Sequence, residues 1–147
     1  MAKRLISSCI LFFIVIFFYG CGAPKKLINL VDIAEVKMVK GGDIDIAYKT
    51  FGHGEPWILI MGYTGTMDMW SPKALNEFAK YYQVIIFDNR GMGLTSVGNK
   101  EFTVDLFGNY TAELLDALNI KKANVLGWSM GTEIALSLTK SQVMQDP

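Results

Sequence analysis

Apolar and polar residues alternate soon after position 35, and this pattern predicts a β-hairpin. Val36–Lys40 and Ile44–Tyr48 each place apolar residues at every second position over part of their length. Successive side chains of a strand point to opposite faces, so each segment is typical of a half-buried strand. Gly41-Gly42 between them predicts a two-residue turn.

Three later segments are apolar or largely apolar without alternation: 57–61, Val84–Phe87 and, with Asn124 inside it, Ala123–Leu126. Short continuous runs of this kind are typical of strands buried on both faces, as in a parallel sheet. The chain between them carries helical signals. Ser71 and Thr103 are suited to cap two helices, and a further helix is expected from Thr132.

Buried strands that alternate with amphipathic helices predict the α/β class, with a mostly parallel sheet and helices on both faces. Ligands of such sheets bind at the carboxyl ends of the strands. The loop 62–65 follows one predicted strand and Ser129 follows another. Both are therefore expected at the same edge of the sheet.

The strongest chemical signal is Gly127-Trp128-Ser129-Met130-Gly131, which lies between a predicted strand and a predicted helix. In that context the G-x-S-x-G pattern indicates a nucleophile elbow, in which a sharp turn exposes the serine hydroxyl. Small residues two positions before and after the serine let the strand and helix approach each other. The N–H of Met130 is then expected to face a developing oxyanion. A purely structural turn is the alternative.

Composition narrows the function further. The chain has 147 residues, enough for one ordinary domain, and its 14 basic and 14 acidic residues balance. Nothing therefore suggests nucleic-acid binding. Cys9 lies in the apolar amino-terminal segment that is expected to be removed, and the one remaining cysteine and one histidine cannot supply the usual four zinc ligands, so no metal is predicted. No cofactor is predicted either, because Gly91-x-Gly93 lacks the third glycine of a dinucleotide motif at Ser96.

The first residues have the pattern of an export signal. Lys3 and Arg4 precede an apolar run, Ile10–Tyr19, and Gly20-Cys21 follows it. The run is shorter than the roughly 20 residues that a spanning helix needs. Residues 1–20 are therefore predicted to be a signal peptide, residues 21–34 a tether, and residues 35–147 a partial domain. The alternatives are an anchor that is not cleaved, or an ordinary signal peptide in which Cys21 has no role.

Phe18-Tyr19-Gly20-Cys21 resembles the lipobox of bacterial lipoproteins, although that family usually has Leu at the first of these positions and a small residue at the second. The resemblance implies cleavage before Cys21 and lipidation of its sulfur. The mature protein would then be exported and anchored to a membrane of a bacterial cell envelope through Cys21.

From about Val36 to Thr139 the chain resembles the amino-terminal half of the α/β-hydrolase fold superfamily, truncated after the helix that follows the elbow. The features that carry the resemblance come in family order: the hairpin, Met61–Gly65 with Trp70 after it, Asp88–Thr95, and the elbow. The resemblance implies that strand 83–88 lies between the hairpin and strand 57–61. Strand 123–128 would lie on the other side of strand 57–61.

The same resemblance implies that Ser129 is the nucleophile and that backbone N–H groups of Tyr63 and Met130 form the oxyanion hole. Met61 stands where the family usually has histidine, which puts the contacts that support the hole in doubt. Asp88 and its neighbours are expected to shape a turn and not to take part in the chemistry.

A serine hydrolase of this fold also needs an acid and then a histidine after the serine. After Ser129 the acids are Glu133 and Asp146, and there is no histidine. The histidine of the chain, His53, precedes strand 57–61, so at about 3.3 Å per residue it should lie on the order of 16 Å from Ser129. The chain therefore lacks a complete triad.

The sequence thus predicts half of a lipid-anchored serine hydrolase that acts on small-molecule esters, lactones or thioesters and is inactive on its own. The alternative is a non-catalytic lipoprotein, or a decayed fragment, that retains the hydrolase scaffold.

Overall fold

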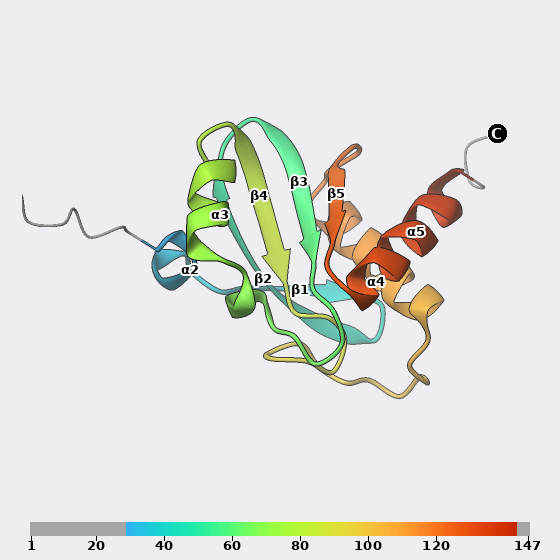
Figure 1. Ribbon diagram of the computed structural model, residues 1–147. Helices are drawn as coiled ribbons and strands as arrows, with labels where there is room; N and C mark the ends of the chain where they lie inside the picture. The colour runs from blue at the N-terminus through green and yellow to red at the C-terminus, as the bar shows by residue number, and fades with distance from the viewer. Residues whose placement is uncertain (1–28, 144–147) are drawn as a thin grey trace, which may run out of the picture.

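The computed structural model describes residues 29–143 of the chain, so the predicted signal peptide and Cys21 lie outside the described residues. Helices and strands alternate along most of this range (Figure 1). In chain order the elements are α2 (Leu30–Ile33), β1 (Lys37–Gly41), β2 (Ile44–Gly52), β3 (Glu55–Ile60), the 3-10 helix η1 (Met67–Met69), α3 (Pro72–Phe78), β4 (Tyr82–Phe87), α4 (Val104–Ala117), β5 (Asn124–Gly127) and α5 (Met130–Val143).

The strands form one five-stranded sheet in the order β1-β2-β4-β3-β5. β1 pairs antiparallel with β2 and β2 antiparallel with β4, whereas β3 is parallel to both β4 and β5. The predicted α/β class and the predicted strand order are confirmed. The sheet is mixed because the hairpin joins the three parallel strands through an antiparallel pair.

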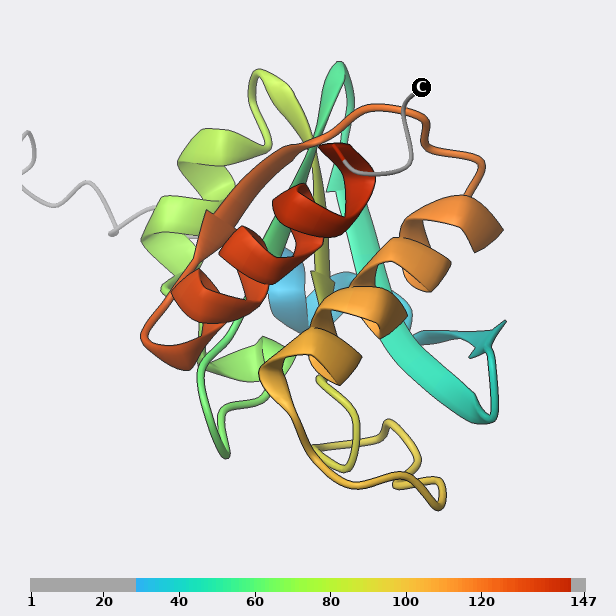
Figure 2. The same ribbon diagram turned by 90° about the vertical axis from the view of Figure 1, so that its right-hand side faces the viewer.

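Helices cover both faces of the sheet. α2 and α3 lie on one face, and α4 and α5 lie side by side on the other (Figures 1 and 2). Alternate residues of β3 serve the two layers: Ile58 packs in the cluster that contains Leu114 of α4, and Leu59 packs in the cluster that contains Leu75 of α3. Burying a side chain of this size contributes about 1.5–3 kcal/mol. This two-sided burial explains the continuous apolar runs of the central strands.

The hairpin turn lies one residue later than the sequence predicts. Gly41 still pairs with Ile44 across the strands, so the two turn residues are Gly42 and Asp43. Gly42 has φ +52°, a conformation that favours glycine. The buried side of β1 carries Val39, whereas Met38 is exposed.

Both predicted helix caps are present. The hydroxyl of Ser71 accepts a hydrogen bond from the Ala74 N–H at 3.5 Å, and that of Thr103 accepts one from the Leu106 N–H at 3.1 Å. Side-chain oxygens at these positions satisfy N–H groups that have no partner inside the helix. α3 and α4 therefore begin where the local sequence predicts.

Part of the expected tether is folded. α2 is a single turn whose N-cap, Asn29, accepts a hydrogen bond from the Val31 N–H at 3.1 Å. Val31 is 2% exposed and packs in the cluster that contains Leu75 and Ile86. Residues 30–33 thus pack against the domain and do not form a free linker.

Candidate active site

Ser129 occupies a sharp turn between β5 and α5. Its φ is +55°, in the left-handed region that residues other than glycine rarely adopt. The turn is held by hydrogen bonds from the Trp128 N–H to the Ile60 carbonyl and from the Thr132 N–H to the Ser129 carbonyl, both 2.9 Å. Such a conformation costs on the order of 1–3 kcal/mol and persists only where its surroundings enforce it. The Ser129 side chain is thereby exposed beyond the end of the sheet.

The two glycines of the elbow stand where a larger residue would collide with backbone. A β-carbon on Gly127 would lie 2.3 Å from the Gly131 carbonyl oxygen. One on Gly131 would lie 2.1 Å from the Ile60 carbonyl oxygen. The start of α5 therefore packs directly against the ends of β3 and β5, as the sequence predicts for this turn.

The loop after β3 lies beside Ser129. β3 and β5 are neighbouring parallel strands in which Ile60 is paired with Gly127, so both chains leave the sheet at the same edge. A β-carbon on Gly62 would lie 2.9 Å from the Cβ and 3.3 Å from the Oγ of Ser129. The structure thus brings together the two segments that the sequence assigns to the site.

Tyr63 and Met130 are the predicted donors to an oxyanion. Tyr63 directly follows Gly62, and Met130 is the first residue of α5. Within residues 29–143, neither N–H group donates a hydrogen bond to the protein. The position of Met130 also places the amino-terminal end of the α5 dipole next to Ser129, where it favours negative charge.

The loop that carries Tyr63 is supported by Met61, which occupies the position of the family histidine. Met61 is buried, and its carbonyl accepts a hydrogen bond from Asn89 Nδ2 at 2.8 Å. Its side chain fills the space beside Gly65, where a β-carbon would lie 2.4 Å from Met61 Cγ. An apolar contact therefore supports this loop.

Asp88 links the same loop to the turn after β4. Its carboxylate accepts hydrogen bonds from the Met67 N–H at 2.7 Å and the Leu94 N–H at 2.8 Å. Gly93 leaves room for that carboxylate, because a β-carbon there would lie 2.1 Å from Asp88 Oδ2. These bonds agree with the structural role that the sequence predicts for Asp88.

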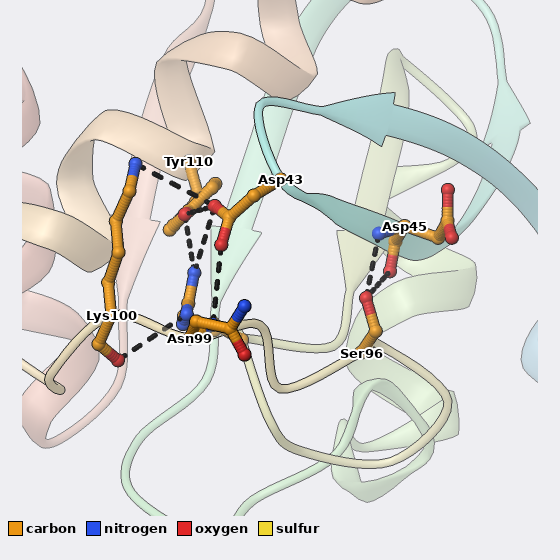
Figure 3. A network of polar contacts seen from close by, with 7 residues as sticks. Asp43, Asp45, Ser96, Asn99, Lys100 and Tyr110 are labelled. Atoms are coloured by element: carbon orange, nitrogen blue, oxygen red, sulfur yellow. Dashed lines mark hydrogen bonds and ion pairs between the residues drawn. The ribbon is translucent and has the colours of Figure 1, made fainter.

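A polar network that the sequence does not predict lies around Asp43 at the tip of the hairpin (Figure 3). The Tyr110 hydroxyl donates to Asp43 and accepts a hydrogen bond from Arg90 Nη1, and Arg90 forms an ion pair with Asp43 at 3.3 Å. Lys100 Nζ lies 3.7 Å from Asp43. The hydrogen bond from Tyr110 is the main reason why the pKa of Asp43 lies well below its usual range.

The network fixes the hairpin tip and the loop 88–100 to α4. Arg90 is almost fully buried, and its guanidinium also lies 4.9 Å from the centre of the Tyr110 ring. Burial and the hydrogen bond to Asp43 raise the pKa of Tyr110. Asp43 and Tyr110 are 67 residues apart in the sequence, so no local pattern indicates their contact.

Among residues 29–143 the structure places neither a histidine nor a paired acid at the elbow, and Asp146 lies outside this range. His53 is exposed in the loop before β3, at the opposite end of that strand from Tyr63. Glu133 lies in the first turn of α5 and is also exposed. Within the described residues, Ser129 therefore has no imidazole that could act as its general base.

The arrangement matches a known family. The sequence model of the alpha/beta hydrolase fold matches residues 56–141. The chain belongs to the α/β-hydrolase fold family. The match begins within β3 and ends within α5, so it covers the loop after β3, the turn after β4 and the elbow, but not the hairpin of β1 and β2.

Individual proteins are also similar to this chain in sequence or in structure. The chain is 41% identical over 97 residues to the "Putative non-heme bromoperoxidase BpoC" of Mycobacterium tuberculosis, covering 65% of this chain and 36% of that protein. It is 34% identical over 91 residues to 3-oxoadipate enol-lactonase 2 of Acinetobacter baylyi, covering 60% of this chain and 34% of that protein. A solved α/β-hydrolase fold protein from Chitinophaga pinensis superimposes with a TM-score of 0.70 at 33% identity, over 76% of this chain and 41% of that one.

The α/β-hydrolase chain thus spans about a third of the length of the curated relatives that it matches. As for membranes, none of the helices within residues 29–143 combines the length and the apolar character needed to cross a bilayer.

Proposed function

We propose that this chain is the amino-terminal half of a serine hydrolase that cleaves ester, lactone or thioester bonds of small molecules. One observation carries the proposal: Ser129 is held at φ +55° at the sheet edge, with Gly62 against its Cβ. The similarity to a protein named as an enol-lactonase supports the choice of substrate class.

In this proposal Ser129 Oγ attacks the carbonyl carbon of the substrate, and the carbonyl oxygen becomes an oxyanion. The N–H groups of Met130 and Tyr63 then donate to that oxygen. Loss of one such donor typically lowers the rate by about 10²–10³-fold. The leaving alcohol or thiol takes a proton, and water later releases the acyl group from Ser129.

The attack needs a base that takes the proton of Ser129. In this fold the acid and the histidine follow the serine in the chain, whereas the single histidine among the 147 residues, His53, precedes it. We therefore propose that the acid and base belong to a carboxyl-terminal half and that the 147 residues alone do not hydrolyse activated esters. The missing base also favours a second candidate, a non-catalytic protein that retains the hydrolase scaffold.

The test is reaction with a fluorophosphonate probe, which labels activated serines. The 147-residue chain should remain unlabelled, whereas the chain joined to the product of its downstream coding sequence should be labelled. The Ser129→Ala variant of the longer protein should lose both the label and ester hydrolysis. A longer protein that remains unlabelled would favour the non-catalytic scaffold. Ser129-dependent labelling of the short chain would reveal a base that we have not identified.

We further propose that Cys21 is lipidated and that it holds the exported protein at a membrane of a bacterial cell envelope. The support is the sequence pattern Lys3, Arg4, Ile10–Tyr19 and Gly20-Cys21. A single acyl chain anchors a protein only marginally, whereas several chains hold it stably through apolar burial in the bilayer. A lipoprotein anchored in this way should therefore remain with membranes in high salt. Metabolic labelling with a fatty-acid analogue tests this proposal. Equal labelling of the natural chain and Cys21→Ser would contradict it.

A further inference from the structure

Lys49 is a buried lysine on β2 that faces the α2–α3 layer. Only 6% of the residue is exposed. Its ammonium donates to the Val31 carbonyl at 2.8 Å and to Asp68 Oδ1 at 2.8 Å. One side chain therefore connects α2, the sheet and η1.

Two contacts compensate for the burial of this charge. An ammonium removed from water is strongly destabilising unless it is paired and hydrogen-bonded. The Val31 carbonyl lies in a helix that is itself packed against the core, since Val31 is 2% exposed. Asp68 supplies the compensating negative charge, and its side chain is 62% exposed. Lys49 thus holds the exposed η1, through Asp68, against α2 and the sheet.

The segment held in this way is the end of the loop that carries Tyr63. At its beginning the loop is held by the hydrogen bond from Asn89 to the Met61 carbonyl. At its end it is held twice: the Met67 N–H donates to Asp88, and Asp68 pairs with Lys49. Tyr63 lies between these anchors, in a turn closed by the hydrogen bond from the Gly65 N–H to the Gly62 carbonyl at 3.1 Å, so the anchors hold the two ends of the segment that carries this turn.

We propose that Lys49 and Asp68 are positioning residues for the Tyr63 N–H, and that docking of α2 contributes to this through the Val31 carbonyl. The inference rests on the proposed function, because it assumes that Tyr63 donates to an oxyanion. Neither residue contacts the substrate. Displacement of a catalytic group by about 1 Å can cost on the order of 100-fold in rate, so a modest ion pair can have a large effect on turnover.

Hydrogen exchange of the full 147-residue chain, followed by mass spectrometry, tests the clamp without any need for catalysis. In Asp68→Ala, amide exchange should rise about tenfold in the segment 62–70 and stay unchanged in residues 30–34, because Lys49 still binds Val31. In Lys49→Met, it should rise in both segments. Lys80→Met is the matched control, because Lys80 pairs with Glu77 at 2.7 Å on the surface and should alter neither segment.

Kinetics of the longer hydrolase test the effect on the oxyanion hole. Asp68→Ala should lower kcat by about 10- to 100-fold with little change in KM, as expected when an interaction specific to the transition state is weakened. Asp68→Glu retains the carboxylate that pairs with Lys49, so it should restore kcat to within a few-fold of the natural enzyme.

The outcomes separate the two proposals. Unchanged exchange at 62–70 in Asp68→Ala would overturn the clamp, and so would raised exchange with an unchanged kcat, because the role would then be merely structural. If instead hydrolysis by the natural long protein did not depend on Ser129, the proposed function itself would fail and this inference with it. A loss of kcat in Asp68→Ala that Asp68→Glu does not show would support both.

Discussion

Gly131 shows how one position can control the elbow. A β-carbon there would lie 2.1 Å from the Ile60 carbonyl oxygen, and neither backbone can retreat without disturbing the contact between α5 and β3. Overpacking of this kind typically costs about 1–3 kcal/mol. We expect Gly131→Ala to lower the urea midpoint of unfolding accordingly. Glu133→Ala, in the same turn of α5 but exposed, should leave the midpoint nearly unchanged, and equal midpoints for the two variants would contradict the close approach.

Glu113 on α4 predicts a pH dependence of stability. Burial raises the pKa of its carboxyl, and the oxygen Oε2 has no hydrogen-bond partner among the described residues. A raised folded-state pKa means that the folded state disfavours the ionised form. Stability should therefore fall as the pH rises from the unfolded pKa towards the higher folded pKa.

Glu113→Gln removes this effect because the amide does not ionise. Thermal unfolding should show a higher Tm for the variant at pH 7 and nearly equal Tm values at pH 4, where the natural carboxyl is largely protonated in both states. Glu101→Gln makes the same chemical change at an exposed position and serves as the control. A destabilised Glu113→Gln at pH 7 would mean that the carboxylate has a partner that we have not identified.

Among the elements, α4 depends on the N-cap residue that precedes it, Thr103. Thr103 Oγ1 lies 3.1 Å from the Leu106 N–H, whereas the corresponding bond of Ser71 at the start of α3 is 3.5 Å long. Loss of a side-chain cap costs about 1 kcal/mol. Thr103→Ala should therefore reduce the free energy of unfolding by about that amount, and Ser71→Ala by less. Thr103→Ser keeps the hydroxyl and should behave like the natural chain in denaturant titrations.

Elements were predictable where the signal is local. The strands at 57–61 and 84–87 follow from apolar runs, and the starts of α3 and α4 follow from Ser71 and Thr103. The hairpin turn was misplaced by one residue because Gly41 and Gly42 satisfy the same turn pattern, and only the pairing of Gly41 with Ile44 decides between the two placements. α2 was missed because one helical turn is too short to show periodicity.

The candidate site was also predictable only in part. The proximity of Ser129 to Gly62 was predictable, because the two residues follow adjacent parallel strands. The catalytic roles of Ser129, Tyr63 and Met130 stay predictions. The contact of Lys49 with Asp68 was not predictable, because Lys49 occupies a strand position at which a lysine would ordinarily point to solvent.

For the molecule as a whole, the position of β5 matters most. It is the last strand in the sheet order, and within residues 29–143 it pairs only with β3. Its outer N–H and C=O groups therefore form an edge, although Val125 and Leu126 are partly buried apolar residues that pack against the core. An unprotected edge of this kind is a template for pairing with another chain.

We therefore expect the 147-residue chain to self-associate through β5. In sedimentation velocity its mean sedimentation coefficient should rise with concentration. Asn124→Lys places a charge on the exposed first position of β5, and charges on an edge strand oppose such pairing, so this variant should shift towards the monomer. Asn109→Lys adds the same charge to the exposed side of α4 and is the matched control. All three proteins share the same amino-terminal residues, so association through that segment would affect them equally. If Asn124→Lys and Asn109→Lys associated to the same extent, the β5 edge would not be the contact.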